Sequence, residues 1–180
     1  GQHLLGIIND ILDLSKIEAG MMGVEAIEAA LPQTLLEVEA MVRPRAAGKG
    51  VGFSTRLSTP VPDRIISDPN RLRQILVNLT NNAAKFTERG RIGIRAEVAG
   101  GELVCSVEDE GIGICPDDQQ FIFDEFFQVD ELASTKYRGS GLGLALVRDL
   151  LRLLDGGISL SSEVGGGTSF TFRVPVQVLA

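Results

Sequence analysis

The chain has 180 residues, of which 44% are hydrophobic and 23% charged, a balance typical of one globular domain or of a domain with an appendage. Its formal net charge of −7 argues against nucleic acid as the main partner, because phosphates would be repelled. The apolar runs fall far short of the roughly 20 residues of a membrane span. Polar residues also interrupt the apolar pattern near the start, so no signal peptide is predicted.

The first predicted elements are two helices. Residues 3–18 carry apolar side chains at helical spacing, and Gly20 is a suitable helix stop. This helix has more apolar surface than the nearby chain can cover, so it needs a partner, either another copy or its own domain. Residues 21–31 are predicted to form a linker. A second helix follows at 32–47, and Pro44 either kinks it or begins its last turn.

The next segments predict a strand, a turn and a well-capped helix. Residues 51–57 alternate as a strand does, and residues 58–62 are typical of a turn. Asp68 is a good N-cap, and Pro69 suits the first helical position. The helix that they begin runs to about Lys85.

The second half of the chain predicts most of a sheet. After a turn at 87–90, alternation on both sides of Gly100 and Gly101 predicts a β-hairpin. The remaining predicted elements are the hairpin strands 91–98 and 102–109, a short helix at 116–121, a long polar segment at 124–140, a helix at 141–154, and strands at 157–162 and 168–174 joined by a turn at 165–167. The whole predicts an α+β fold, a two-layer α/β sandwich whose mostly antiparallel mixed sheet is covered by about three helices.

One face of the helix that follows Asp68 is unusually polar. At about 100° per residue, its polar side chains fall on one stripe beside an apolar stripe of ordinary core residues. The polar stripe comprises Arg71, Gln74, Asn78, Asn82 and Lys85. An Asn oxygen is a hard ligand that suits Mg²⁺, and Lys85 could reach a phosphate. A merely solvated helix face is the alternative.

Two glycine-rich segments could approach a ligand closely. Asp109, Gly111 and Gly113 directly follow a predicted strand, where Asp109 could accept a hydrogen bond from an amino group such as that of adenine. A simple strand-ending turn is the alternative. The second segment, residues 139–143, precedes a helix whose free backbone N–H groups favour phosphate. It is neither a Walker loop nor a Rossmann turn, because no Gly-Lys-Ser/Thr follows and no strand precedes it.

The polar segment 124–140 is longer than most connections in a compact domain, so it is either disordered or a functional lid. Lys136 and Arg138 would bring positive charge to a phosphate, and Tyr137 could stack on a base or ribose. A solvated loop is the competing interpretation.

The order of these motifs resembles the N, G1, F, G2 and G3 boxes of sensor histidine kinases. The amino-acid sequences of the motifs are most similar to those of hybrid kinases. The matching segments are residues 78–87, 109–113, 123–127, 139–144 and 166–168. The resemblance covers about residues 32–176 and implies the Bergerat ATP-binding fold, shared with DNA gyrase, a heat-shock chaperone and mismatch-repair ATPases. Residues 1–20 are similar to the end of the second helix of the family's dimerisation and phosphoacceptor domain. The implied division is therefore 1–20, a linker at 21–31, and a catalytic domain at 32–180.

The resemblance also implies roles, with ATP and Mg²⁺ as the ligands. Asp109 would bind the adenine amino group, and Asn82 would hold Mg²⁺ with Asn78 beside it. The other implied contacts are Gly111 and Gly113 around the adenine; Lys85 with Lys136 or Arg138 at the phosphates; Tyr137 by the base or ribose; Gly139, Ser140, Gly141, Leu142 and Gly143 at the closing lid and helix start; and Phe123, Phe126 and Phe127 as anchors of the lid root.

The chain departs from the family at the phosphoacceptor. The only histidine is His3, which lies in the second-helix pattern and is expected to be an ordinary helix-surface residue. No catalytic residue is therefore assigned, and the phosphoacceptor helix is expected to precede this chain. Asn78 stands where the ATPase relatives carry a glutamate that activates water, so rapid hydrolysis is not expected.

The implied function is transfer of the γ-phosphoryl of Mg-ATP to a histidine on a separate helical domain, in two-component signalling. The implied partners are that domain, a downstream response regulator or receiver, and a second copy in the full-length homodimer; whether the fragment is a monomer stays open. Cys105 and Cys115, without disulfide or metal-site spacing, indicate the cytoplasm or the cytoplasmic part of a membrane-anchored receptor. The alternatives are a degenerate ATP-sensing module without kinase output and an ATPase or chaperone-type clamp.

Overall fold

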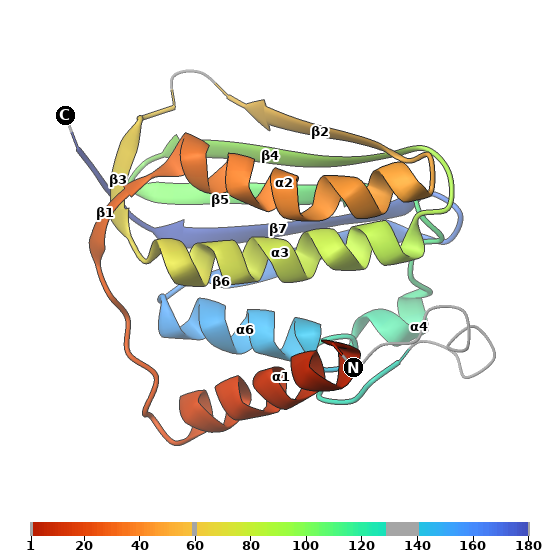
Figure 1. Cartoon of the computed structure of the whole chain (residues 1–180), viewed down its shortest axis with the longest axis horizontal. Helices are drawn as coiled ribbons and strands as arrows, with labels where there is room; N and C mark the ends of the chain where they lie inside the picture. Colours follow the sequence, from red (N-terminus) through yellow and green to blue (C-terminus); the bar gives the residue numbers. More distant parts are fainter. Residues whose placement is uncertain (1, 59–60, 129–140, 180) are drawn as a thin grey trace.

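The computed structural model describes residues 2–58, 61–128 and 141–179, with side chains from Leu4 onward. Helices and strands are interspersed along the chain (Figure 1). In order they are α1 (Gln2–Glu18), β1 (Ile27–Ala30), α2 (Leu31–Gly48), β2 (Gly52–Leu57), β3 (Arg64–Ser67), α3 (Pro69–Phe86), β4 (Arg91–Ala99), β5 (Glu102–Asp109), α4 (Pro116–Gln119), α6 (Gly143–Leu153), β6 (Gly157–Glu163), β7 (Gly167–Pro175) and β8 (Gln177–Val178).

The main sheet has five strands in the order β2-β4-β5-β7-β6, with β2 and β4 parallel and the other neighbours antiparallel. α2, α3 and α6 cover one of its faces (Figure 1). Every second residue of the central strands is buried beneath these helices, including Ile92, Ile94, Leu103, Val107 and Phe172. The two-layer α/β sandwich predicted from the sequence is therefore confirmed.

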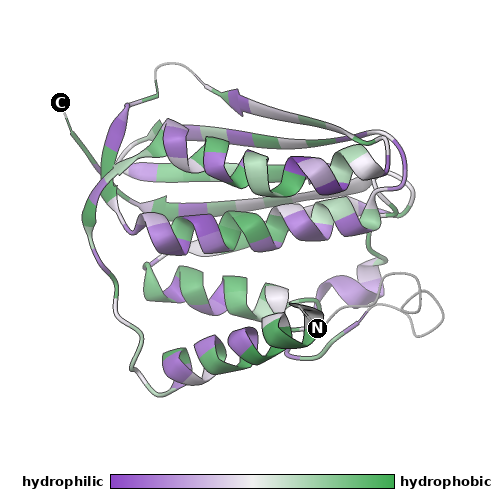
Figure 2. Ribbon diagram, in the orientation of Figure 1, coloured by the Kyte–Doolittle hydropathy of each residue, from purple (hydrophilic) through white to green (hydrophobic). Residues whose placement is uncertain are grey.

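The helix layer is amphipathic, with hydrophobic and hydrophilic residues on each of its helices (Figure 2). The apolar stripe of α3 is fully buried, through Leu72, Ile75, Leu76 and Leu79. Its polar stripe is only half-buried. Among the described residues, no helix is long and apolar enough to cross a membrane.

A second, three-stranded sheet in the order β1-β3-β8 was not predicted. β1 lies in the segment predicted as a linker, and β3 and β8 have no predicted counterpart. Asp68 connects this sheet to α3. Its Oδ1 accepts from the backbone N–H groups of Asn70 and Arg71 at 3.1 and 3.2 Å, which confirms the predicted N-cap, while Oδ2 accepts from the N–H of Glu25 at 2.9 Å.

α1 packs against α6, so the first helix docks on its own domain (Figure 1). Leu14 is buried in this contact, and Ile7 and Ile17 are partly buried. The predicted stop at Gly20 is confirmed, because Gly20 has φ 69° and Met21 N–H bonds back to the carbonyl of Lys16 at 2.8 Å. The opposite side of α1 remains exposed, through Leu4, Leu5, Ile8, Ile11 and Leu12.

Pro44 lies inside α2, and one further turn of helix follows it to Gly48, in agreement with the prediction that it begins the last turn. Two predicted helix bounds were wrong. The last predicted helix begins at Gly143 rather than at residue 141, because Gly141 has a left-handed φ of 74° that a right-handed helix does not accept. The short helix α4 ends at Gln119.

Candidate functional site

The polar stripe of α3 divides into two parts. In its first half, Arg71 Nη1 donates to Gln74 Oε1 at 3.3 Å, and Gln74 Nε2 donates to Asp13 Oδ2 of α1 at 2.8 Å. Gln74 therefore bonds α1 to the domain, and Arg71 bonds to Gln74. In its second half, the side chains of Asn78 and Asn82 have no hydrogen-bond partner within the part of the chain that the structure describes. Their amides are available to a ligand.

The end of α3 adds a cation to this half. Burial lowers the pKa of the Lys85 ammonium, and the nearby charge of Arg45 lowers it further. No carboxylate among the described residues forms an ion pair with Lys85. Its Nζ lies 4.9 Å from the centre of the Phe86 ring. A half-buried ammonium without a protein counter-ion is suited to an anionic ligand.

Lys49 fixes the position of this helix end, and the sequence pattern did not single it out. Its Nζ donates to the carbonyl oxygens of Ala84 and Lys85 at 2.9 and 3.0 Å, which are among the last free acceptors of α3. It also forms a 3.6 Å ion pair with Glu88. The only sequence signal was a lysine just after a helix, and its contact lies 35 residues away in the chain.

Asp109 lies at the end of β5, where the strand turns toward α3. Burial raises the pKa of its carboxyl, although hydrogen bonds from the backbone N–H groups of Gly111 and Thr168 oppose the shift. The Gly111 bond is 2.9 Å long. A carboxylate that keeps accepting capacity in a partly buried position can recognise an amino group, as adenine presents.

The turn after Asp109 requires its glycines. A side chain at Gly111 would place Cβ 2.6 Å from the carbonyl oxygen of Phe86, and one at Gly113, where φ is 73°, would overlap the Glu163 carbonyl. Two backbone hydrogen bonds stabilise this close packing. The Ile112 N–H donates to the carbonyl oxygen of Phe86 at 3.3 Å, and the Gly165 N–H donates to the carbonyl oxygen of Ile112 at 2.8 Å. The Asp109 turn therefore lies directly against the end of α3.

The start of α6 meets the amide-bearing half of α3. A Cβ on Gly143 would lie 3.6 Å from Asn78 Oδ1, so the two groups are neighbours. Leu142, at the N-cap, is buried, and its apolar side chain cannot cap the first N–H groups. These N–H groups, with the helix dipole, can bind a phosphate. The C-terminal end of α3 and the N-terminal end of α6 lie on the same side of the molecule, next to α4 (Figure 1).

The phenylalanines of residues 123–127 differ in role. Phe123 packs edge-on against Phe170 with ring centres 6.1 Å apart, and Phe127 pairs with Phe121 at 5.8 Å. Phe126 is 64% exposed, and its backbone N–H donates to the carbonyl oxygen of Gly141 at 2.9 Å. Arg148 of α6, which the pattern missed, donates to the Phe123 carbonyl at 3.0 Å.

Several predicted site residues lie outside the described residues. They are Lys136, Tyr137, Arg138, Gly139 and Ser140. The structure brings the other predicted members together at one end of the molecule: Asn78, Asn82 and Lys85 on α3, Gly111 and Gly113 against its end, and Gly143 beside Asn78.

The described residues contain no group of three His, Cys, Asp or Glu side chains that could hold a metal ion by themselves. The donor set on α3 nevertheless fits Mg²⁺. Asn82 offers a hard amide oxygen without a protein partner in the described part, and Mg²⁺ typically takes one or two protein oxygens together with substrate phosphates and water.

Comparison with protein families supports the same assignment. Residues 67–178 match the family described as histidine kinase-, DNA gyrase B- and HSP90-like ATPase. The chain belongs to this family. The matched region contains α3, the Asp109 turn and the start of α6, which are the elements that form the site.

Similar curated proteins are sensor kinases of the histidine kinase branch. The chain is 40% identical to the autoinducer 2 sensor kinase/phosphatase LuxQ of Vibrio vulnificus strain YJ016, over 98% of the chain and 21% of LuxQ. It is 39% identical to the signal transduction histidine-protein kinase BarA of Escherichia coli K12, over 98% of the chain and 20% of BarA. The chain therefore spans about a fifth of these relatives.

Solved structures agree. Full-length ShkA in complex with AMPPNP matches with a TM-score of 0.86 at 36% identity, covering 99% of this chain and 37% of ShkA. The nucleotide-free catalytic domain of the histidine kinase ThkA matches with a TM-score of 0.72 at 27% identity, covering 84% of this chain and 95% of that domain. The fold is that of a histidine kinase ATPase domain.

Proposed function

We propose that this chain binds Mg-ATP and transfers its γ-phosphoryl to a histidine on a helical phosphoacceptor domain that is not part of the chain. The observation that carries the proposal is the amide-bearing half of α3, which faces the start of α6 and lies beside the Asp109 turn. Amide oxygens, free helix N–H groups and a buried carboxylate are the three kinds of group that a metal-nucleotide complex needs.

Each group has a defined task. The Asp109 carboxylate accepts from the adenine amino group, and Gly111 and Gly113 leave room for the base. The start of α6, with Lys85 and with Lys136 or Arg138, binds the phosphates. Asn82, with Asn78 beside it, would hold Mg²⁺, which when bound neutralises phosphate charge. Tyr137 would lie by the base or ribose, and residues 139–143 would close over the phosphates.

Asn78 determines what happens to the terminal phosphoryl. A carboxylate at this place could take a proton from water, whereas an amide cannot act as a base. The γ-phosphoryl is therefore kept until an imidazole nitrogen attacks it, when the bond to ADP breaks. Positioning and charge neutralisation, the main sources of catalysis in such transfers, are what these residues supply.

The remaining parts of the proposal concern the longer protein. Residues 1–20 belong to the second helix of a dimerisation and phosphoacceptor domain, and residues 32–180 form the catalytic domain. The phosphoryl passes on to a response regulator or receiver, in a homodimer whose kinase part lies in the cytoplasm. The similarity to the sensor kinase/phosphatase LuxQ and the signal transduction histidine-protein kinase BarA supports a role in phosphoryl signalling.

The test is to mix the chain with the phosphoacceptor domain of its own full-length protein and γ-labelled ATP. Acid-labile, base-stable phosphohistidine should form on that domain and not on the chain alone. If ATP binds but no phosphohistidine forms, the chain is an ATP-sensing module without kinase output. If ATP is instead turned over to ADP rapidly by the chain alone, the proposed role of Asn78 is wrong.

A further inference from the structure

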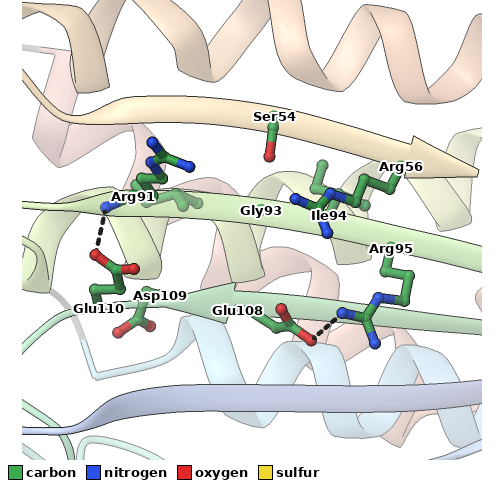
Figure 3. A pocket seen from close by; sticks show the side chains of 10 residues that line it. Ser54, Arg56, Arg91, Gly93, Ile94, Arg95, Glu108, Asp109 and Glu110 are labelled. Carbon is green, nitrogen blue, oxygen red and sulfur yellow. Dashed lines mark hydrogen bonds and ion pairs between the residues drawn. The ribbon is translucent and has the colours of Figure 1, made fainter.

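The face of the main sheet that points away from the helices carries a groove of about 290 Å³. Ile92 and Ile94 of β4 point toward the helices and are buried, so Arg91, Gly93 and Arg95 point to the opposite face. Together with Ser54 and Arg56 of the edge strand β2 they surround the groove (Figure 3). Glu108, Asp109 and Glu110 lie along its other side.

The strand register brings like charges together in this groove. Arg56 and Arg95 are direct cross-strand partners in the parallel pair of β2 and β4. Two cations in that position repel each other unless an anion lies nearby. Glu108 lies 3.4 Å from Arg95. Within the part of the chain that the structure describes, the guanidinium groups of Arg56 and Arg91 have no carboxylate partner.

Glu110 does not neutralise Arg91. Its carboxylate accepts from the backbone N–H of Arg91 at 3.2 Å, rather than from the guanidinium group. In Figure 3 the Arg91 side chain extends away from Glu110. The guanidinium groups of Arg56 and Arg91 therefore present N–H donors without a carboxylate partner on the β2 side of the groove.

Gly93 forms the floor between these arginines and is the cross-strand partner of Ser54. Its backbone does not require glycine, because its φ is not left-handed and an added Cβ would meet Ser54 Oγ at an ordinary 3.6 Å. A glycine in mid-strand costs stability, and such positions often mark a close approach by a ligand. Here the missing side chain leaves the hollow open.

We propose that this groove binds a small oxyanion with two or more acidic groups, such as a di- or tricarboxylate. Arg56 and Arg91 hold one acidic group each through their planar donor forks, and the Ser54 hydroxyl donates to the ligand between them. The volume is at the lower end for small-molecule sites, which favours a compact ligand over a docked protein segment. Asp109 is shared between this groove and the proposed nucleotide site, but the ligand-binding side chains of Ser54, Arg56 and Arg91 lie on the sheet face opposite α3, so the inference does not rest on the proposed function.

The test is a titration of the ¹⁵N-labelled chain with citrate at low ionic strength and without Mg²⁺, followed by NMR. Saturable shifts are expected at the Gly93 amide and the Arg56 and Arg91 side chains, and added salt should weaken the binding. The Arg56→Gln/Arg91→Gln variant should bind at least about tenfold more weakly, because two charge-assisted contacts are lost. Gly93→Ala, which fits the fold, should weaken binding several-fold by filling the floor.

The matched control is Arg173→Gln, on the same exposed sheet face but outside the groove, which should change affinity less than about twofold. Equal losses in Arg173→Gln and in the double variant would show a general charge effect and overturn the proposal. Shifts that do not saturate would do the same. A hexaglutamate peptide that binds more tightly than citrate would overturn it in favour of an acidic protein segment.

Discussion

The two halves of the polar face of α3 look alike in the sequence and differ in the structure. Arg71 and Gln74 are joined to each other and to Asp13 of α1 by hydrogen bonds of 3.3 and 2.8 Å. Asn78 and Asn82, one and two turns further on, have no such partners among the described residues. Apart from Arg71 Nε, which is buried without a partner among the described residues, the first half is hydrogen-bonded within the protein, whereas the second half is open to a ligand. A polar helix stripe is therefore not one site, and its unpartnered members are the ones to test.

The largest expected effect is at Asn82. Asn82→Ala removes the amide oxygen proposed for Mg²⁺. Because the ion would lose its proposed protein ligand next to the phosphates, affinity for Mg-ATP measured by calorimetry should fall at least about 100-fold. Gln74→Ala is the matched control, because Gln74 lies on the same polar face of α3 but bonds to Asp13 within the protein. It should change the affinity for Mg-ATP less than about twofold. Similar losses in both variants would remove the distinction between the halves. Equal thermal unfolding of both would exclude misfolding.

The second effect concerns pH and depends on Asp109. Burial raises the pKa of this carboxyl, so ATP affinity should fall on acidification at a higher pH than an ordinary aspartate would cause, because the protonated form loses acceptor capacity. The stability of the nucleotide-free chain should change the opposite way. A raised pKa means that the folded state holds the proton more tightly, so Asp109's contribution to stability is lost as pH rises through that pKa.

Asp109→Asn should abolish both dependences and bind ATP much more weakly, roughly 100-fold, because a donor would face the adenine amino group. Glu108→Gln is the control, since the neighbouring carboxylate points to the other face of β5. It should keep ATP affinity and its pH dependence. A pH profile that is the same in Asp109→Asn and in the wild type would assign the titration to another group.

A smaller effect is expected at Lys85, at the far end of the open half. Lys85→Gln should lower ATP affinity about tenfold and ADP affinity less, if the ammonium contacts the outer phosphates. Lys49→Gln is informative beside it, because Lys49 holds the same helix end through carbonyl groups. It should lower thermal stability more than it lowers nucleotide affinity. An affinity loss confined to Lys49→Gln would mean that Lys85 points away from the nucleotide.

The main sheet and the polar stripe of α3 were predictable because both depend on local periodicity. Strand alternation predicted β4 and β5, and helical spacing predicted Asn78, Asn82 and Lys85 as one stripe. The small sheet was not predictable, because β1 and β3 have four residues each and β8 has two, too few to show a period. Its pairing also joins distant segments, as Ile65 with Val178.

The division of the α3 stripe could not be predicted for the same physical reason. Gln74 and Asp13 are 61 residues apart in the sequence, and their contact exists only because α1 docks beside α3 and α6. The facing arginines of the outer groove likewise depend on the parallel register of β2 and β4, which sets Arg56 beside Arg95. Local patterns gave the candidates, and tertiary pairing decided which of them are already satisfied.

The smallest expected effect tests the hydrogen-bonded half directly. Asp13→Ala removes the carboxylate that accepts from Gln74, so α1 should detach more often from the domain, and exchange of its amide hydrogens should become about fivefold faster, in line with roughly 1 kcal/mol for one hydrogen bond. Lys16→Ala, on the exposed side of α1, is the control and should leave exchange unchanged. ATP affinity should stay the same in both variants, because neither side chain reaches the open half of α3. If Asp13→Ala did lower ATP affinity, the two halves would be coupled through Gln74 and Arg71, and α1 docking would be part of nucleotide binding rather than separate from it.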